Sequence, residues 1–248
     1  MRKNKIAILI SGELRTFKKC ISFNLNKFSD YEIYIVHGVW NYEVNEELMG
    51  FIEKLKKDFN NIIDYRIISI KFNINMFKEI DRVKLPEILK QLEPKNSRGN
   101  LPLFYSMNLV FNNLLESSLI NEFKYIVRLR PDIRVYTFNL KIPEINKNEI
   151  IVGHSKTIAS DNFALGRLNE MKTYFGVFKQ LNNYWKLPIN FNNYNKVPVG
   201  ERLMKIHLEN NQIKFYTPFN TTFFIHKNFK LKEYLLIIYN YIIKLKNL

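Results

Sequence analysis

The residues best suited to chemistry follow a short apolar run near the middle of the chain. The run Tyr125–Leu129 contains Arg128 and leads into Arg130, a proline and Asp132, with Arg134 two residues further on. Such a pattern predicts a buried strand whose carboxyl end opens onto a loop. A carboxylate among three arginines at a strand end suits an anionic ligand, with or without a divalent cation. The alternative is a solvated strand end that carries paired surface charges.

A second cluster directly follows the apolar run at residues 6–10 and contains Ser11, Gly12 and Arg15. A glycine lets the backbone approach a ligand closely, and amides at the start of a following helix attract anions. Arg15 is able to hold a diphosphate through two parallel hydrogen bonds. The glycine and lysine spacing of the Rossmann and Walker fingerprints is absent. An ordinary strand-to-helix turn is therefore the alternative.

Two carboxylates further along the chain are candidate general bases. Asp161 lies among small and aromatic residues, a setting that can raise a carboxyl pKa and suit it to proton abstraction. Glu201 falls in the first turn of a predicted helix, where the helix dipole favours an acidic side chain in any case. The alternative for Asp161 is a helix N-cap or turn aspartate, which is a common role for that residue.

The sequence shows no metal-binding cluster. Its four histidines are dispersed, and none is followed four residues later by another histidine. A metal ion would therefore be Mg²⁺ or Mn²⁺, held by Asp132 and by the phosphate oxygens of a ligand. His37 and Trp40 close the second apolar run, which indicates either a structural histidine or a loop that packs on a base or sugar ring.

The elements that position these residues alternate between strand and helix patterns. Apolar and β-branched runs predict strands at residues 5–11, 32–37, 67–72, 125–129 and 150–152. Apolar residues at helical spacing predict helices at 16–27, 45–59 and 103–114, and the polar stretch 93–102 predicts a loop. This alternation predicts an α/β fold in which a mostly parallel central sheet is flanked by helices. No linker or repeat divides the chain, so we expect one compact unit.

The composition favours a well-packed globular protein. The 248 residues are 46% hydrophobic and 15% aromatic, which provides a sizeable core and excludes a disordered chain. The single cysteine, Cys20, excludes an intramolecular disulfide and fits a reducing compartment. The N-terminal apolar run is too short for the core of a signal peptide, and no run is long enough to span a bilayer as a helix. We therefore expect a cytoplasmic protein.

The formal net charge of +15 favours polyanionic partners such as nucleic acid, anionic lipid or phosphate-bearing substrates. The lysines are scattered, however, and no helix-turn-helix, zinc-finger or ribonucleoprotein signature is present. Abundant Lys, Asn and Ile also arise from an AT-rich genome without any functional reason. The charge permits an anionic ligand, and nucleic acid is not the expected partner.

Taken together, the motifs resemble those of bacterial surface-polysaccharide glycosyltransferases. The chain is similar to the GT-A-like enzymes of capsule and lipopolysaccharide synthesis, including the WavE-like group. In this resemblance, the Arg-x-Asp element lies where other GT-A enzymes carry Asp-x-Asp. The resemblance covers roughly residues 5–210 and rests on Ile6–Thr16, Ile33–His37, Tyr125–Asp132, Asp161–Gly166 and Glu201.

The resemblance implies a single GT-A-like, Rossmann-like domain over residues 1–229 that transfers a sugar from a nucleotide-diphosphate donor to a saccharide acceptor. Asp132 is then expected to meet a metal ion or the donor sugar. Asp161 is expected to act as the base of an inverting reaction, with Glu201 second, although a retaining route stays open. Because Arg130 occupies the place of the first aspartate, it can neutralise the diphosphate, which leaves metal dependence open. The residues expected to bind the donor are Ser11, Gly12, Arg15, Arg128, Arg130 and Asp132.

The C-terminal segment over residues 230–248 is expected to form a separate helix. Residues 235–243 are apolar almost all round and are flanked by lysines. The segment is too short to span a bilayer, but it suits peripheral contact with the inner membrane, where lipid-linked saccharide acceptors reside and lysines meet anionic headgroups. A buried core helix or an oligomer contact is the alternative.

Two other functions fit part of this pattern. A non-catalytic polyanion-binding domain accounts for the charge but gives no reason for strand-end carboxylates such as Asp132 and Asp161. A sugar nucleotidyltransferase has a related α/β shape. Its glycine-rich signature with a lysine near the first strand is absent from this sequence.

Overall fold

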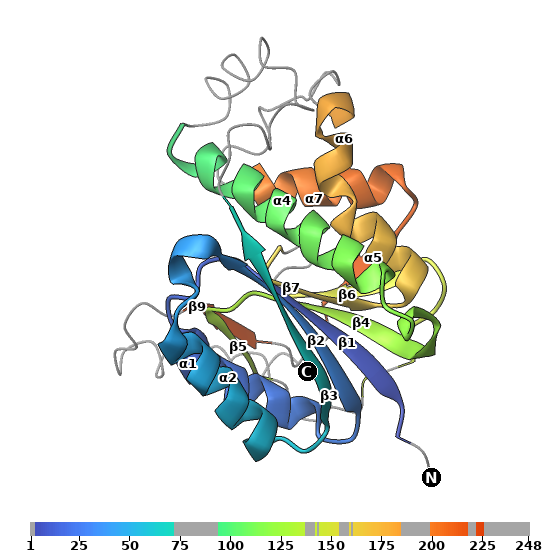
Figure 1. Cartoon of the computed structure of the whole chain (residues 1–248). Helices are drawn as coiled ribbons and strands as arrows, with labels where there is room; N and C mark the ends of the chain where they lie inside the picture. The colour runs from blue at the N-terminus through green and yellow to red at the C-terminus, as the bar shows by residue number, and fades with distance from the viewer. Residues whose placement is uncertain are drawn as a thin grey trace, which may run out of the picture.

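The computed structural model describes residues 3–71, 94–136, 142, 144–153, 159, 161–184, 199–217 and 222–225. Its centre is a seven-stranded sheet with the strand order β3-β2-β1-β4-β7-β6-β8 (Figure 1). A separate antiparallel pair consists of β5 (Ile133–Tyr136) and β9 (Thr222–Ile225). The strands of the large sheet are β1 (Lys5–Ser11), β2 (Glu32–Trp40), β3 (Ile62–Ile70), β4 (Phe123–Leu129), β6 (Glu149–Val152), β7 (Phe163–Gly166) and β8 (Lys214–Tyr216).

All strands of the large sheet run in one direction except β7, which is antiparallel to both of its neighbours. The mostly parallel sheet that the sequence predicts is thereby confirmed. Because β7 is reversed, its first residue lies at the edge where β1 and β4 end, as the pairing of Phe163 with Leu129 shows. The residues just before β7 therefore join the loops that follow β1 and β4.

Helices cover both faces of the sheet (Figure 1). Neighbouring residues of β1 divide between two cores. Ile6, Ile8 and Ile10 pack with α1 and α2, whereas Ala7 and Leu9 pack with α4 on the other face. Burial on both faces explains why β1 and β2 are continuous apolar runs in the sequence. The helices are α1 (Phe17–Leu25), α2 (Glu46–Asp58), α4 (Pro94–Leu115), α5 (Leu168–Phe175), α6 (Val177–Tyr184) and α7 (Val199–Asn210), with 3-10 turns η1 (Asn26–Phe28), η2 (Asn41–Glu43) and η4 (Ile120–Glu122).

Most of the predicted elements are present with shifted ends, and one prediction is wrong. The strand predicted at 67–72 begins at Ile62, and the second strand continues past His37 to Trp40. The loop predicted at 93–102 is helix from Pro94 onward, with Pro102 inside α4. Proline lacks an amide hydrogen, which is no loss in the first turn of a helix. The buried apolar stripe that follows along α4 then offsets the interruption at Pro102.

The predicted C-terminal helix at residues 230–248, and with it the boundary at residue 229, lies outside the described residues. His154 and His226 also lie outside them. In the part of the chain that is described, no helix combines the length and the apolarity that crossing a membrane requires.

Candidate functional site

The loop after β1 is strained and packs against the loop after β4. Gly12 has a φ of 127°, a backbone conformation that other residues rarely adopt. A Cβ atom on Gly12 would lie 3.3 Å from Cδ of Pro131 and 3.6 Å from Cγ of Arg130, so glycine also permits the close approach of the two loops. Arg15 has a φ of 24°, which is a strained value for a residue with a side chain. Backbone strain of this kind concentrates at ligand sites.

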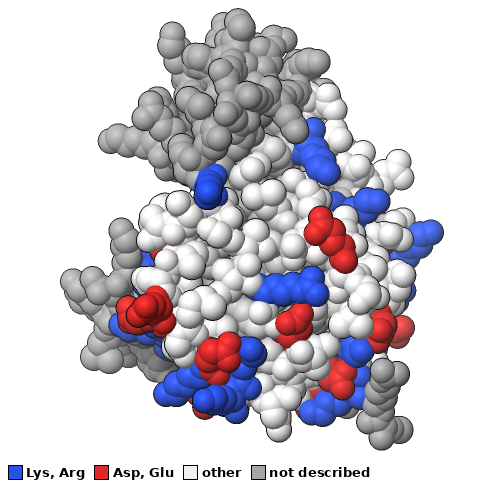
Figure 2. All heavy atoms as spheres, in the orientation of Figure 1, with Lys and Arg blue, Asp and Glu red and all other residues white. Residues whose placement is uncertain are grey.

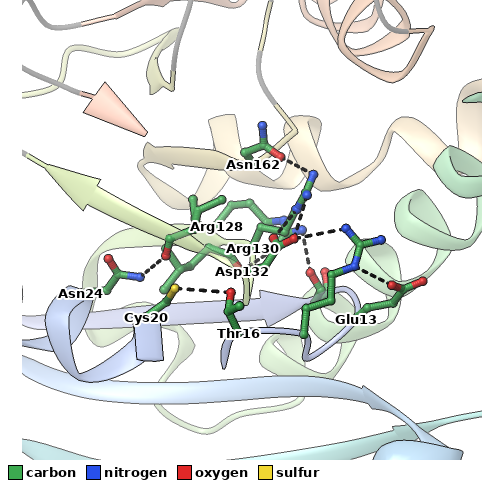
Figure 3. A network of polar contacts seen from close by, with 12 residues as sticks. Glu13, Thr16, Cys20, Asn24, Arg128, Arg130, Asp132 and Asn162 are labelled. Atoms are coloured by element: carbon green, nitrogen blue, oxygen red, sulfur yellow. Dashed lines mark hydrogen bonds and ion pairs between the residues drawn. The ribbon is translucent and has the colours of Figure 1, made fainter. Parts of the chain in front are cut away.

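The loop after β4 carries a bidentate ion pair. Arg130 donates from Nε to Oδ1 of Asp132 over 2.6 Å and from Nη2 to Oδ2 over 2.9 Å. Arg15 approaches the same carboxylate from the first loop, and its Nη1 lies 3.5 Å from Oδ2 (Figure 3). Asp132 is only 2% exposed. One buried carboxylate therefore holds two guanidinium groups at the edge of the sheet.

Asn162 fixes the Arg130 side chain from a third direction. Its Oδ1 accepts a hydrogen bond of 2.7 Å from Nη1 of Arg130, and its carbonyl accepts one of 2.9 Å from the Arg130 amide. Asn162 immediately precedes β7, so the reversed strand brings this residue, and Asp161 beside it, to the arginines. Burial opposes the charge on Arg130, but the hydrogen bonds and charge of Asp132, together with the charge of Asp161, raise the pKa of Arg130 overall.

The two candidate bases lie at the same edge. Asp161, before β7, and Glu201, in α7, are 7% and 8% exposed. Burial raises the pKa of Asp161, against the opposing charges of Arg130 and Arg128. Burial and the charge of Asp161 raise the pKa of Glu201 to about 7, against the charge of Arg130. The two carboxyl groups thus share one electrostatic environment, and Glu201 titrates near neutral pH.

Tyr174 belongs to the same group of residues, although no sequence pattern singled it out. It lies in α5 and is fully buried. Burial raises the pKa of its hydroxyl, the charge of Arg128 opposes this, and the charges of Asp161 and Glu201 add to it. In the sequence Tyr174 resembles an ordinary core residue of a helix. Asn162, which was also missed, had a weak signal, because it is polar and directly precedes an apolar run.

Ser11 and Arg128, both expected to bind the donor, are 0% exposed. Nη2 of Arg128 donates a hydrogen bond of 2.8 Å to the Ser11 carbonyl, and Nη1 donates to the carbonyl of Leu129. These bonds join the end of β1 to the end of β4. In this arrangement Ser11 and Arg128 support the two loops from inside the protein.

Arg134, the third arginine that the sequence places around Asp132, reaches toward α1. Its Nη2 donates a hydrogen bond of 2.9 Å to the carbonyl of Lys19 in α1. The arginines that both contact Asp132 and reach solvent are therefore Arg15, whose side chain is 38% exposed, and Arg130, whose side chain is 20% exposed.

Two glutamates orient the loop after β1. Oε1 of Glu43, in η2, accepts a hydrogen bond of 2.9 Å from the Leu14 amide, and Glu13 accepts one of 2.7 Å from Nε of Arg15. Burial raises the pKa of Glu43. Because a protein carboxylate already binds the Leu14 amide, an anionic ligand here meets the Arg15 side chain rather than that amide.

His37 and Trp40 have structural positions in the core and do not form a loop that could pack on a base or sugar ring. His37 is fully buried, and its Nδ1 lies 2.8 Å from the hydroxyl of Tyr65. Burial and the charge of Arg128 lower the pKa of His37 to about 3, so the ring is neutral at physiological pH. Trp40 is 6% exposed and lies in the core. The exposed aromatic ring of this segment is instead Tyr42, at 68%.

A metal ion at this edge would need oxygen ligands. Asp132 is the carboxylate expected to bind one, but both of its oxygens accept hydrogen bonds from guanidinium groups. Among the residues that the structure describes, no three or more His, Cys, Asp or Glu side chains are grouped so as to hold a metal ion. The side chains present fit a cationic site for phosphate better than a metal site.

A separate hollow lies between α4, α5, α6 and α7. Its volume is about 280 Å³, and its lining contains amide side chains and two lysines, Lys172 and Lys179, but no carboxylate. His207 also lines it and is only 2% exposed. None of the predicted site residues lines this hollow.

Comparisons with known proteins give structural neighbours only. No protein-family model matches the chain, and no curated protein sequence matches it. Among solved structures, the chain is similar to the mannosyltransferase Ktr4p from S. cerevisiae, with a TM-score of 0.47 and 10% identity over 91% of this chain and 71% of that chain. The chain is also similar to core-mannan synthase A (CmsA/Ktr4) from Aspergillus fumigatus in its Mn/GDP form, with a TM-score of 0.45 and 9% identity over 92% of this chain and 76% of that chain.

The chain is also similar to the glycosyltransferase GlyE of Streptococcus pneumoniae TIGR4, with a TM-score of 0.42 and 9% identity over 88% of this chain and 46% of that chain. Scores and identities of this size assign no function. Function has to be argued from the site itself.

Proposed function

We propose that the protein is a glycosyltransferase that uses a nucleoside-diphosphate sugar as donor. The observation that supports this most is that two guanidinium groups and two buried carboxyl groups meet at one edge of the sheet. Arg15 and Arg130 suit the leaving diphosphate, whose negative charge grows as its bond to the sugar breaks. Asp161 and Glu201 suit removal of the proton from the acceptor hydroxyl. An inverting glycosyl transfer can use both kinds of group side by side.

On the donor side, the guanidinium groups bind and orient the diphosphate. The planar fork of an arginine matches two phosphate oxygens at once. Gly12 lets the two loops approach each other closely, which sets the positions of Arg15 and Arg130. Tyr42 is exposed on the neighbouring η2 turn and offers an aromatic face beside the loop that carries Arg15.

On the acceptor side, we propose Asp161 as the base and Glu201 as the second choice. Burial raises the pKa of Asp161, which makes its carboxylate a stronger base, while the opposing charges of Arg130 and Arg128 favour its ionised form. A charged carboxylate at this position can take the proton of a sugar hydroxyl as the new bond forms. Glu201 has a pKa of about 7 and therefore also titrates near the operating pH of a cytoplasmic enzyme.

The acceptor that we propose is a saccharide, free or lipid-linked, of bacterial capsule or lipopolysaccharide synthesis. This part of the proposal rests on the resemblance of the sequence motifs to the WavE-like group. It places the protein in the cytoplasm, with peripheral contact at the inner membrane where a lipid-linked acceptor is used.

The competing function is a non-catalytic polyanion-binding domain, which the net charge of +15 favours. A nucleic-acid interface concentrates Lys and Arg on one face. On the face drawn in Figure 2, Lys and Arg side chains are instead interspersed with Asp and Glu. The buried carboxyl groups of Asp161 and Glu201 beside the arginines have no role in such a domain.

A thermal-shift panel separates the two functions. We expect UDP, GDP or CDP to stabilise the protein, by about 2.7 kcal/mol when the ligand is present at 100 times its dissociation constant. The control ligand is double-stranded DNA, which supplies phosphates without a terminal diphosphate. Stabilisation by DNA, with none by any of the three nucleotides, would support the polyanion-binding domain instead.

A further inference from the structure

Both oxygens of the Asp132 carboxylate are already bound by the protein's own cations. Arg130 contacts both of its oxygens, over 2.6 and 2.9 Å, and Arg15 contacts one of them over 3.5 Å. Asp132 is 2% exposed, so water does not compete for these contacts. A divalent cation would have to displace at least one guanidinium group from this buried carboxylate. The displaced charge would then lie beside the arriving metal ion, which is unfavourable.

The two guanidinium groups keep donors for a ligand while Asp132 holds them. A guanidinium has five N–H donors. Arg130 uses three of them, two with Asp132 and one with Asn162. Arg15 uses two, one with Glu13 and one with Asp132. Both side chains are partly exposed, at 20% and 38%, so their remaining N–H groups are accessible to a ligand.

The positions of these groups are fixed before any ligand arrives. Arg130 is held on one side by Asp132 and on the other by Asn162, while Gly12 packs against the Pro131 ring. The neighbouring Leu14 amide is bound by Glu43. Preorganised cations stabilise a developing negative charge without having to rearrange during the reaction. This is the contribution that a bound divalent cation makes at other diphosphate sites.

We infer that Arg15 and Arg130, held by Asp132, form a diphosphate site that binds a nucleoside diphosphate without a divalent cation. Asp132 acts as a positioning residue that holds the two arginines, and it is not a metal ligand. The inference rests on the proposed function, because it concerns the leaving group of that reaction. It goes further by assigning the neutralisation of the diphosphate to the side chains of this chain.

The first experiment measures binding of UDP, GDP and CDP to the full chain by calorimetry and thermal shift, in EDTA and in Mn²⁺. We expect the dissociation constant of the bound nucleotide to be the same in both within about twofold, which is less than 0.5 kcal/mol. Inorganic pyrophosphate, as a probe without base or ribose, should compete for the site in EDTA.

The second experiment removes the arginines. Arg15→Gln should weaken nucleotide binding in EDTA by about 10-fold or more, because charge-assisted hydrogen bonds to phosphate are lost. The double variant Arg130→Gln with Asp132→Asn should do the same without leaving a buried unpaired carboxylate. The matched control is Arg66→Gln. Arg66 also pairs with an aspartate two residues away, Asp64, over 3.0 Å, but it lies in β3 away from the site.

The outcomes separate the inference from the proposed function. Equal binding in EDTA and Mn²⁺, lost in Arg15→Gln and kept in Arg66→Gln, supports the inference. Binding only with Mn²⁺ overturns the inference and leaves the proposed function standing. Binding in EDTA that Arg15→Gln and the double variant do not weaken also overturns it. If no nucleoside diphosphate binds in either condition, the proposed function fails first and the inference fails with it.

Discussion

At the scale of single residues, the central feature is that one buried acid organises two exposed cations. Asp132 lies at the strand end where the sequence places a carboxylate among arginines, and Arg130 binds both of its oxygens. The sequence did not indicate that Arg134 turns toward α1 or that Asn162 binds Arg130. Strand-end spacing places residues at an edge, but it does not decide which way each long side chain turns.

The proposed base predicts an ordering of two variants. Asp161→Asn should lower kcat by about 10²–10⁴-fold and spare nucleotide affinity, because the amide keeps the shape of the carboxylate but cannot accept the proton. Glu201→Gln should be milder. Single-turnover rates and nucleotide binding, measured side by side, check this. The reverse ranking would assign the base to Glu201, and equal small effects would favour a retaining route.

The raised pKa of Glu201 also predicts how stability depends on pH. Its pKa rises from 4.5 to about 7 on folding, so between these values the folded state binds more protons than the unfolded state. Stability therefore falls as the pH rises through this window, and the whole penalty is present above pH 7. Glu201→Gln removes the penalty. Relative to the wild type, the free energy of unfolding of the variant in urea should be higher by about 1–3 kcal/mol at pH 8, since solvent screening reduces the full effect, and little changed at pH 4.

If the free energies of unfolding of Glu201→Gln and the wild type differed by the same amount at every pH in this range, burial would not raise the pKa of Glu201. Because the charges of Asp161 and Glu201 interact, the pH dependence of this difference reports the titration of the pair.

At the scale of elements, the site depends on one strand that runs against the others. The sequence predicts β1, β2 and β4 because each is a largely apolar run of five or more residues, but β7 has only four residues and was not expected. Its direction follows from its pairing with β4 and β6, which no local pattern encodes. Asp161 was predicted as a candidate base from its neighbours in the sequence. That it lies near Arg130 could not be predicted, because this depends on the direction of β7. The α7 helix around Glu201 was predicted from its own residues.

Two glycines, one in the strained loop after β1 and one in α2, should respond to substitution by alanine in opposite ways. Gly12→Ala should destabilise the protein by about 1–3 kcal/mol, because of its φ of 127° and its contact with Pro131. It should also weaken nucleotide binding. Gly50→Ala lies in the middle of α2, where the new Cβ meets no atom within 4 Å apart from its chain neighbours and the helix's own backbone, and should stabilise by about 0.5–1 kcal/mol. Urea unfolding measures both, and a Gly12→Ala variant as stable as the wild type would contradict the strain.

At the scale of the whole molecule, two cores on either side of one sheet hold the site at its edge. The alternation of strand and helix patterns in the sequence predicts a sheet flanked by helices, and the helices packed on both faces confirm it. The prolines near residue 100 misled the prediction, because packing along the rest of α4 outweighs their local preference. The C-terminal segment lies outside the described residues, and its role stays a prediction.

Truncation after Phe229 tests the prediction that the C-terminal segment contacts the membrane surface. Removal of the apolar run at 235–243 and its flanking lysines should reduce binding to anionic liposomes, and added salt should reduce binding of the full chain. Vesicle cosedimentation with and without anionic lipid measures this, and nucleotide binding should persist in the truncated chain. Insoluble or unfolded protein would instead show that the segment belongs to the core.

The most direct test of the account is hydrogen exchange of the full chain with and without the nucleoside diphosphate that stabilises it most. We expect slower amide exchange in residues 12–16, after β1, and in residues 130–133, after β4, because the ligand orders both loops. Protection confined to the hollow between α4, α5, α6 and α7, or absent from both loops, would contradict a diphosphate site at this edge of the sheet.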